Sequence, residues 1–186
     1  MKETTPPMVG FCAWSGTGKT TLLTRLLPLL TAHGLKVAVV KHAHHTFDID
    51  YPDKDSYKIR KAGASQTLIA SRKRMALITE FEEGRDEPSL DEALSGLDME
   101  AIDIILVEGF KHENYPKIEL HRPDMNRPLL FPDDSNILAV ASDAPVHENK
   151  QLPKLNLNNP EQIVRFILDN IIGARSRVTA TGAGKS

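Results

Sequence analysis

The sequence predicts an α/β protein in which a mainly parallel sheet is flanked by helices. Three observations favour this class. Short apolar runs alternate with helical patterns along the chain, a helix is expected between the first two strands, and a glycine-rich turn leads into that helix. A helical crossover between consecutive strands makes them parallel. The 186 residues suffice for one domain with one core. We therefore expect a single domain over residues 1–173 and a disordered tail over 174–186.

The first three elements are the clearest. The apolar run over residues 8–14 predicts a buried strand that ends in a loop. From residue 19 leucines recur at helical spacing until Gly34, which is typical of a helix end. Pro28 lies inside this helix and is expected to kink or shorten it. The β-branched segment 35–41 predicts the second strand.

The later elements are shorter. Polar residues with glycine and proline predict loops over 42–55 and 82–89. Ser89, followed by Glu92 at the capping-box position, predicts the start of a helix. The remaining helices and strands are expected at 56–62, 66–70, 75–79, 90–96, 102–107, 117–121, 137–141 and from 159 onward.

The turn between the first strand and the first helix has the pattern of a phosphate-binding loop. Its sequence is Ala-Trp-Ser-Gly-Thr-Gly-Lys-Thr over residues 13–20, which matches G-x-x-x-x-G-K-[ST] at every position except the first. The glycines let backbone N–H groups approach phosphate oxygens, and the helix that follows adds its positive dipole end. Lys19 is expected to neutralise the β- and γ-phosphates, and the Thr20 hydroxyl to bind Mg²⁺. The phosphate-contacting residues are expected to be Ser15, Gly16, Thr17, Gly18, Lys19, Thr20 and Thr21.

An acid follows the most apolar strand candidate. Residues 104–107 are Ile-Ile-Leu-Val and lead into Glu108 and Gly109. In P-loop proteins a strand beside the first one ends with an acid near Mg²⁺. We therefore assign Glu108, together with Lys19, as the catalytic residues. Glu108 is also expected to bind Mg²⁺, directly or through a water. Gly109 would let the chain turn under the γ-phosphate.

A polar loop follows the second strand, and its role stays open. It contains Lys-His-Ala-His-His over 41–45, and Asp48 and Asp50 follow. Loops at the carboxyl ends of parallel strands bind ligands, so these residues could bind a transition metal, contact the nucleotide or Mg²⁺, or be solvated. Arg60 could reach a phosphate or be a surface arginine, and Glu80 is a further possible site acid.

Composition excludes some classes of function. The net charge of -2 argues against a nucleic-acid-binding protein, which would carry a basic surface. No stretch approaches the roughly 20 apolar residues that span a bilayer, and the first residues lack the apolar core of a signal peptide. One cysteine cannot form an internal disulfide, so a soluble cytoplasmic protein is expected.

Several motifs together resemble one family. They are Ala-Trp-Ser-Gly-Thr-Gly-Lys-Thr-Thr-Leu-Leu (13–23), Lys-His-Ala-His-His (41–45), Lys-Asp-Ser-Tyr (54–57), Arg-Lys-Ala-Gly-Ala (60–64) and Leu-Val-Glu-Gly-Phe-Lys (106–111). In this order, and over roughly residues 8–172, the chain resembles the molybdopterin-guanine dinucleotide biosynthesis protein B (MobB) family.

The resemblance implies a P-loop NTPase fold and a GTP-binding protein with weak Mg²⁺-dependent GTPase activity, often a homodimer. It would assist the molybdopterin guanylyltransferase, the partner enzyme that attaches GMP to molybdopterin. By motif, residues 15–21 would hold the phosphates and Mg²⁺, and Glu108 and Gly109 would face the γ-phosphate. Asp50, Arg60 and Glu80 are further nucleotide-side candidates.

Selectivity for guanine needs a carboxylate, because guanine offers a ring N–H and an exocyclic amine as a pair. Asp143 follows the strand over 137–141 and is the candidate, the alternative being a turn aspartate ahead of Pro145. Two other functions stay open from the residues alone. One is a small-molecule kinase, for which the basic turn 72–74 would have to act as a lid; the other is a metal-delivering NTPase that uses the histidine loop.

Overall fold

The computed structural model describes residues 5–43, 47–82, 84–146 and 152–174. The described residues within 1–42 and 89–174 form one compact unit, and those within 43–88 form a second. The single domain expected over 1–173 stays a prediction. The expected tail lies outside the described residues except for Ala174.

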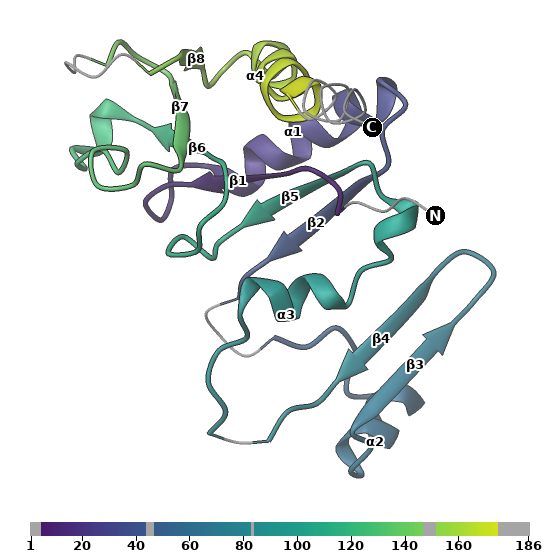
Figure 1. The fold of residues 1–186 in the computed structure, drawn as a ribbon. Helices are drawn as coiled ribbons and strands as arrows, with labels where there is room; N and C mark the ends of the chain where they lie inside the picture. The colour runs from purple at the N-terminus through teal and green to yellow at the C-terminus, as the bar shows by residue number, and fades with distance from the viewer. Residues whose placement is uncertain (1–4, 44–46, 83, 147–151, 175–186) are drawn as a thin grey trace, which may run out of the picture. The chain divides into compact units, whose positions relative to one another are not determined.

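The first unit is built on a six-stranded sheet with the order β2-β5-β1-β6-β7-β8. Every neighbouring pair is parallel, which confirms the predicted fold class (Figure 1). The strands are β1 (Met8–Cys12), β2 (Val37–Lys41), β5 (Ile104–Glu108), β6 (Lys117–His121), β7 (Ile137–Ser142) and β8 (Lys154–Asn156). The edge strand β8 has no counterpart among the predicted elements, because it is three residues long and only Leu155 in it is buried.

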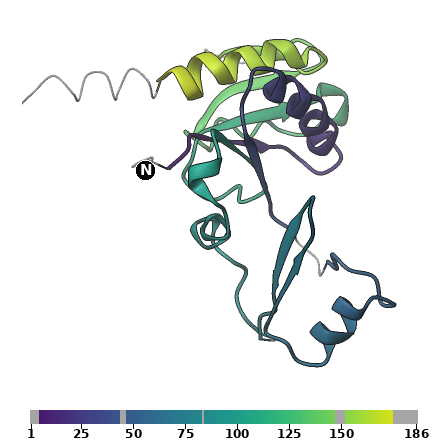
Figure 2. The same cartoon turned by 90° about the vertical axis from the view of Figure 1, so that its right-hand side faces the viewer.

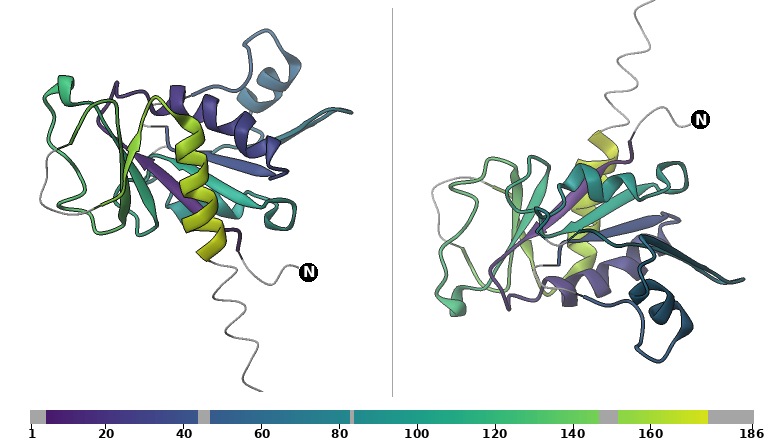
Figure 3. Two further views of the ribbon diagram at one scale, coloured as in Figure 1. Left: turned by 90° about the horizontal axis from the view of Figure 1, so that it is seen from above. Right: turned by 90° about the horizontal axis from the view of Figure 1, so that it is seen from below.

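Helices cover both faces of this sheet. Helices α1 (Lys19–Ala32) and α4 (Pro160–Ile167) pack over one face, and the views in Figures 1 and 3 show them crossing the strands together. Helix α3 (Leu90–Ser95) packs on the other face, against Ile105 and Val107 of β5. Strand β5 is thus buried from both sides, as expected for a central strand of a parallel sheet.

Short helical segments complete this unit. Two 3₁₀ turns occur at Met99–Ala101 and Pro123–Met125, and α4 continues into a π-helical turn at Leu168–Ile172. Ser89 caps α3 by accepting a 3.2 Å hydrogen bond from the Glu92 N–H, as the capping box predicts.

Two details of the first βα unit were open in the sequence. Helix α1 continues past Pro28 to Ala32, so the proline does not end it, and the expected kink stays a prediction. Leu26 and Leu30 on either side of the proline are buried in the core. Strand β1 ends at Cys12, two residues before the apolar run does. Trp14 belongs to the loop, where its indole Nε1 donates a 2.8 Å hydrogen bond to the Pro128 carbonyl.

The second unit contains α2 (Asp55–Lys61), β3 (Gln66–Ala70) and β4 (Met75–Thr79). The two strands form an antiparallel hairpin, which Figure 2 shows as an extended ribbon. The predicted basic turn joins them, closed by a 2.9 Å hydrogen bond from Ser71 N–H to the Arg74 carbonyl. Across the described part of the chain, no helix has the length and apolar character needed to cross a membrane.

Candidate nucleotide-binding site

The loop between β1 and α1 forms an open cradle at the carboxyl edge of the sheet. Gly16 and Gly18 have positive φ angles of 82° and 103°, which only glycine adopts readily. Gly18 also caps α1 without a side chain, so the first N–H groups of the helix stay accessible to an anion. A pocket of about 330 Å³ is lined by Ser15, Gly16, Gly18, Lys19, Thr20, Thr21 and Glu108.

Of the seven predicted loop residues, six line this pocket and Thr17 supports it from behind. Thr17 is 2% exposed, and its hydroxyl donates a 2.7 Å hydrogen bond to the Trp14 carbonyl. The Lys19 ammonium lies 3.3 Å from the Ala13 carbonyl oxygen, so it reaches back across the loop. Alanine at position 13 therefore still supplies the backbone oxygen that holds the lysine.

The acid predicted from the strand pattern lies beside the phosphate loop. Glu108 Oε1 accepts a 3.3 Å hydrogen bond from the Thr20 hydroxyl, and Oε2 lies 2.9 Å from the Lys41 ammonium. The Glu108 side chain is only 9% exposed. A hydroxyl and a carboxylate side by side are the oxygen ligands that Mg²⁺ prefers, so Thr20 and Glu108 fit the predicted metal role.

Lys41 also lies at the candidate site. The sequence placed it in the polar loop after the second strand but did not predict its ion pair with Glu108. Lys41 pairs in register with Glu108 because β2 and β5 are parallel neighbours. Its ammonium compensates a carboxylate that is mostly withdrawn from water. The signal was a lysine at the end of the second strand, but its meaning depends on which strand lies next to β2.

The backbone conformation and the close packing at position 109 require a glycine. Its φ is 102°, and a Cβ atom there would lie 2.4 Å from the His42 Cβ. The carbonyls on either side are both held: Glu108 O accepts from His42 N–H at 2.8 Å, and Gly109 O accepts from the Tyr115 hydroxyl at 2.7 Å. Phe110 also has a positive φ of 48° and stacks on His42 with ring centroids 4.6 Å apart.

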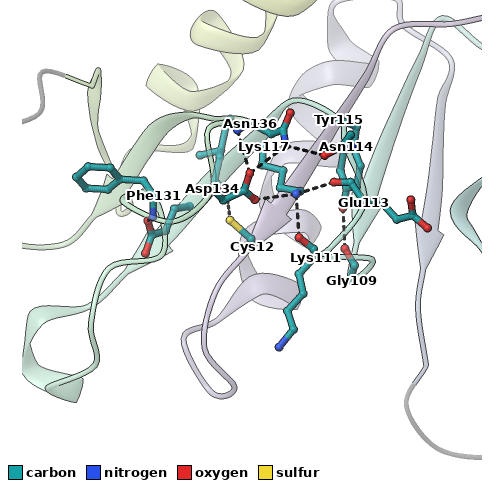
Figure 4. Close-up of polar contacts among 12 residues, drawn as sticks. Cys12, Gly109, Lys111, Glu113, Asn114, Tyr115, Lys117, Phe131, Asp134 and Asn136 are labelled. Atoms are coloured by element: carbon teal, nitrogen blue, oxygen red, sulfur yellow. Dashed lines mark hydrogen bonds and ion pairs between the residues drawn. The ribbon is translucent and has the colours of Figure 1, made fainter.

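A buried lysine anchors the segment after Gly109, as Figure 4 shows. The Lys117 ammonium donates 2.8 Å hydrogen bonds to the Lys111 carbonyl, the Glu113 carbonyl and Asp134 Oδ2, and the residue is 1% exposed. Burial opposes ionisation of Asp134, but hydrogen bonds from Lys117 and Asn136 lower the pKa of its carboxyl. The segment that turns under the predicted γ-phosphate position is therefore held at several points.

Arg122 links the phosphate loop to Asp143. Its Nε donates a 2.9 Å hydrogen bond to the Thr17 carbonyl, and its Nη1 pairs with Asp143 Oδ2. Asp143 directly follows β7, at the same edge of the sheet as the loop. Asp143 is a candidate from the sequence and its role stays a prediction, whereas Arg122, which follows β6, the neighbour of β1, is not among the predicted residues.

The other three predicted site residues belong to the second unit. Arg60 Nη1 lies 2.6 Å from Glu80 Oε1, and Nη2 lies 2.5 Å from Asp48 Oδ1. Hydrogen bonds with Glu80 and Asp48 raise the pKa of the guanidinium, which keeps its charge. Asp50 Oδ1 accepts a 3.0 Å hydrogen bond from the Tyr51 N–H. The structure thus brings Arg60 and Glu80 together, and a nucleotide role for all three stays a prediction.

The histidine loop is only partly described. His44 and His45 lie outside the described residues, so the three interpretations of this loop stay open. Within the ranges that are described, no group of three or more histidine, cysteine, aspartate or glutamate side chains is placed to hold a metal ion. Cys12 is buried, and desolvation raises the pKa of its thiol to about 12.

Comparison with known proteins identifies the family. The family model described as molybdopterin guanine dinucleotide synthesis protein B (MobB) matches residues 8–143. The molybdopterin-guanine dinucleotide biosynthesis adapter protein of Escherichia coli K12 is 45% identical over 168 residues, which are 90% of this chain and 94% of the relative. The protein of that name from Haemophilus influenzae is 42% identical over 173 residues, covering 91% and 93%.

Solved structures agree with this assignment. A crystal structure of molybdopterin-guanine biosynthesis protein B is 31% identical, with a TM-score of 0.66 over 87% of this chain and 97% of that one. A crystal structure of Bacillus subtilis MobB, at 24% identity and a TM-score of 0.67 over 89% and 98%, supports the fold. The P-loop NTPase fold predicted from the sequence is confirmed. The chain belongs to the molybdopterin guanine dinucleotide synthesis protein B (MobB) family.

Proposed function

We propose that this protein is a GTP-binding adapter with weak Mg²⁺-dependent GTPase activity that assists the attachment of GMP to molybdopterin. The observation that carries the nucleotide part is the meeting of Thr20 with Glu108 over the phosphate-loop pocket. The adapter part is supported by the two bacterial relatives, both molybdopterin-guanine dinucleotide biosynthesis adapter proteins, which are 42–45% identical over nearly their whole length.

The roles of the pocket residues follow from their positions. Backbone N–H groups of residues 15–21 would bind the phosphate oxygens, and Lys19 would neutralise charge on the β- and γ-phosphates. Thr20 and Glu108 would hold Mg²⁺, directly or through a water. Mg²⁺ held there would offset the negative charge that develops on the phosphates during hydrolysis. Gly109 would face the γ-phosphate with its backbone.

The proposed hydrolysis is slow because the pocket offers little beyond phosphate binding. Fast P-loop GTPases add a residue that orients the attacking water and an arginine that neutralises the transition state. Among the residues that the structure describes, the charged side chains lining the phosphate pocket are Lys19 and Glu108. Both are already assigned to the ground-state phosphates and to Mg²⁺. A protein with these groups is suited to binding a nucleotide rather than to rapid turnover.

A second copy of the chain is the proposed structural partner. The β3–β4 hairpin exposes Leu68, Met75 and Leu77, which are 59%, 71% and 57% accessible. A two-stranded hairpin with exposed apolar side chains is marginally stable in water and has unpaired edges. Association with the same hairpin of another copy would cover both, which supports the homodimer.

The proposed function is tested by reconstitution. GMP attachment to molybdopterin by purified guanylyltransferase should be measured with GTP, with and without this protein. We expect this protein to raise the yield of molybdopterin guanine dinucleotide, and the Lys19→Ala variant to lose the effect. If yield is independent of this protein at every guanylyltransferase concentration, the adapter role is wrong.

A further inference from the structure

Lys41 ends β2 and lies next to the phosphate-loop pocket, although it is not among the residues that line this pocket. Its ammonium lies 2.9 Å from Glu108 Oε2, and the other carboxylate oxygen, Oε1, accepts the 3.3 Å hydrogen bond from the Thr20 hydroxyl. The function proposed above assigns Thr20 and Glu108 to Mg²⁺, but it gives Lys41 no role. One oxygen of the predicted metal ligand is therefore held by a cation whose function is open.

The two partners of this ion pair differ in burial. The Lys41 side chain is 55% exposed, whereas that of Glu108 is 9% exposed. An ammonium that reaches water can leave a carboxylate at little cost, because water solvates it and exposed ion pairs are weak. A carboxylate that is mostly withdrawn from water stays in place and keeps its need for a cation. Lys41 is therefore the movable partner of the pair, and Glu108 is the fixed one.

The backbone keeps Lys41 at the carboxyl edge of the sheet whatever its side chain does. The residue pairs in register with Glu108 in the parallel ladder of β2 and β5. The next residue, His42, donates a 2.8 Å hydrogen bond from its N–H to the Glu108 carbonyl. The ammonium sits on a flexible four-carbon stem, so it can change its partner while its Cα atom stays fixed. Any new partner must then lie close to the end of the pocket that Glu108 and Thr20 mark.

The charges of the proposed ligands favour such a change of partner. Mg²⁺ at Glu108 would place two positive charges beside the ammonium, and like charges repel at this separation. GTP would carry its γ-phosphate, whose oxygens are strong hydrogen-bond acceptors, to the same end of the pocket. Lysine is a mobile point charge with three donors, which suits it to bind such oxygens. GDP has no γ-phosphate, so it offers the displaced ammonium no partner at this end.

We infer that Lys41 is a specificity-determining residue whose ammonium passes from Glu108 to the γ-phosphate of GTP, so that the protein binds GTP more tightly than GDP. The inference rests on the proposed function, since it needs Mg²⁺ and a nucleotide at the phosphate loop. It adds the residue that distinguishes the two nucleotides. In the alternative, Lys41 only balances the charge of Glu108 and makes no contact with the nucleotide.

The test compares the binding of GTP and GDP in variants of Lys41. Lys41→Met removes the ammonium and keeps an unbranched side chain. Lys36→Met is the matched control, because Lys36 is an exposed lysine that precedes β2 at the opposite end of the strand. The comparison is repeated with Glu108→Gln present, where Lys41 has no carboxylate to balance. Affinities for GTP and GDP are measured by calorimetry with Mg²⁺, and urea unfolding shows whether each variant is folded.

We expect Lys41→Met to lower the ratio of GTP to GDP affinities about tenfold or more, the range that loss of a hydrogen bond to a charged group gives. The same loss should appear with Glu108→Gln present, because the ammonium acts on the nucleotide itself. Lys36→Met should keep the ratio of the unaltered protein. The double variant Lys41→Met with Glu108→Gln leaves no unbalanced charge, so it decides the question if Lys41→Met alone does not fold.

Three results would overturn the inference while GTP binding itself stands. The first is an unchanged ratio in folded Lys41→Met. The second is a ratio that falls only while Glu108 is present, which would mean that Lys41 acts through the carboxylate alone. The third is equal affinity of the unaltered protein for GTP and GDP. Failure of the unaltered protein to bind either nucleotide would instead remove the proposed function.

Discussion

The Thr20 hydroxyl donates a 3.3 Å hydrogen bond to the Glu108 carboxylate, although the two residues are 88 positions apart. The parallel pairing of β1 with β5 brings them together, since it places the end of β5 beside the start of the phosphate loop. This contact marks the end of the pocket where Mg²⁺ and the γ-phosphate would lie.

Removing the charge of Glu108 should slow GTP hydrolysis strongly and affect the stability of the fold only weakly. Glu108→Gln keeps the size of the side chain but weakens a metal ligand and leaves Lys41 without its carboxylate. We expect phosphate release from GTP to fall roughly 10- to 100-fold, as for other residues that tune a metal site. Glu161→Gln, in the first turn of α4, is the control and should behave like the unaltered protein. Equal hydrolysis by all three proteins would show that Glu108 is not at the reacting end.

Tyr115→Phe should reduce the discrimination between GTP and GDP. The ring still packs against Gly10, but the hydrogen bond to the Gly109 carbonyl is lost. The free energy of unfolding should fall by about 1 kcal/mol. The ratio of GTP to GDP affinities should fall as well, because Gly109 would no longer be fixed under the γ-phosphate. If Tyr115 has only a structural role, the Tyr115→Phe variant will have a lower melting temperature but an unchanged ratio of GTP to GDP affinities.

Breaking the ion pair between the buried Lys117 and the partly exposed Asp134 should destabilise the protein. Lys117→Met leaves Asp134 Oδ2 and two backbone carbonyls without the lysine donor, although Asn136 still donates to Oδ1. Loss of one partner of a fully buried pair costs about 3–5 kcal/mol, and the cost here should be smaller because the Asp134 side chain is 23% exposed. Urea unfolding at pH 7 measures the loss. The double variant Lys117→Met with Asp134→Asn should recover part of it, whereas additive losses would mean that the two side chains act independently.

The ion pair between Lys117 and Asp134 should make the free energy of unfolding sensitive to acid. The folded-state pKa of Asp134 is lowered, so its contribution is fully present above its unfolded-state pKa, about 3.9, and is lost as pH falls through the folded-state value. Between pH 5 and pH 2 the unaltered protein should lose more unfolding free energy than Asp134→Asn does. Identical pH profiles for the two proteins would contradict the role of Asp134.

Asp143→Ala should weaken GTP more than ATP, because only guanine offers the paired N–H donors. Arg122→Ala serves as the comparison. It frees Asp143 and also removes the contact with Thr17, so both nucleotides should bind more weakly. If Asp143→Ala costs GTP and ATP equally, or costs neither anything, Asp143 does not select the base.

Local sequence patterns made some residues of this site predictable. The others depend on the order of the strands in the sheet, which the sequence does not show directly. The phosphate loop could be found because strand, glycines, lysine and helix are contiguous in sequence. Glu108 could be found because its strand is apolar throughout. Arg122 and Lys41 could not, because their contacts depend on which strands are neighbours. Lys117 resembles a surface lysine until its carbonyl partners are known.

The element boundaries show the same limit. Strand β8 is too short and too polar to give a periodic signal, and it forms only by pairing with the edge of β7. Trp14 extends an apolar run, yet a hydrogen bond to Pro128, 114 residues away, places it in the phosphate loop. In both cases a tertiary contact decides what local preference cannot.

Titration of the purified protein with GTP and with ATP in the presence of Mg²⁺, followed by measurement of phosphate release, tests the central claim most directly. We predict tighter binding of GTP, slow release of phosphate, and loss of both in Lys19→Ala with an unchanged melting temperature. Preference for ATP, with hydrolysis or transfer only after a small acceptor is added, would contradict the claim and favour a kinase.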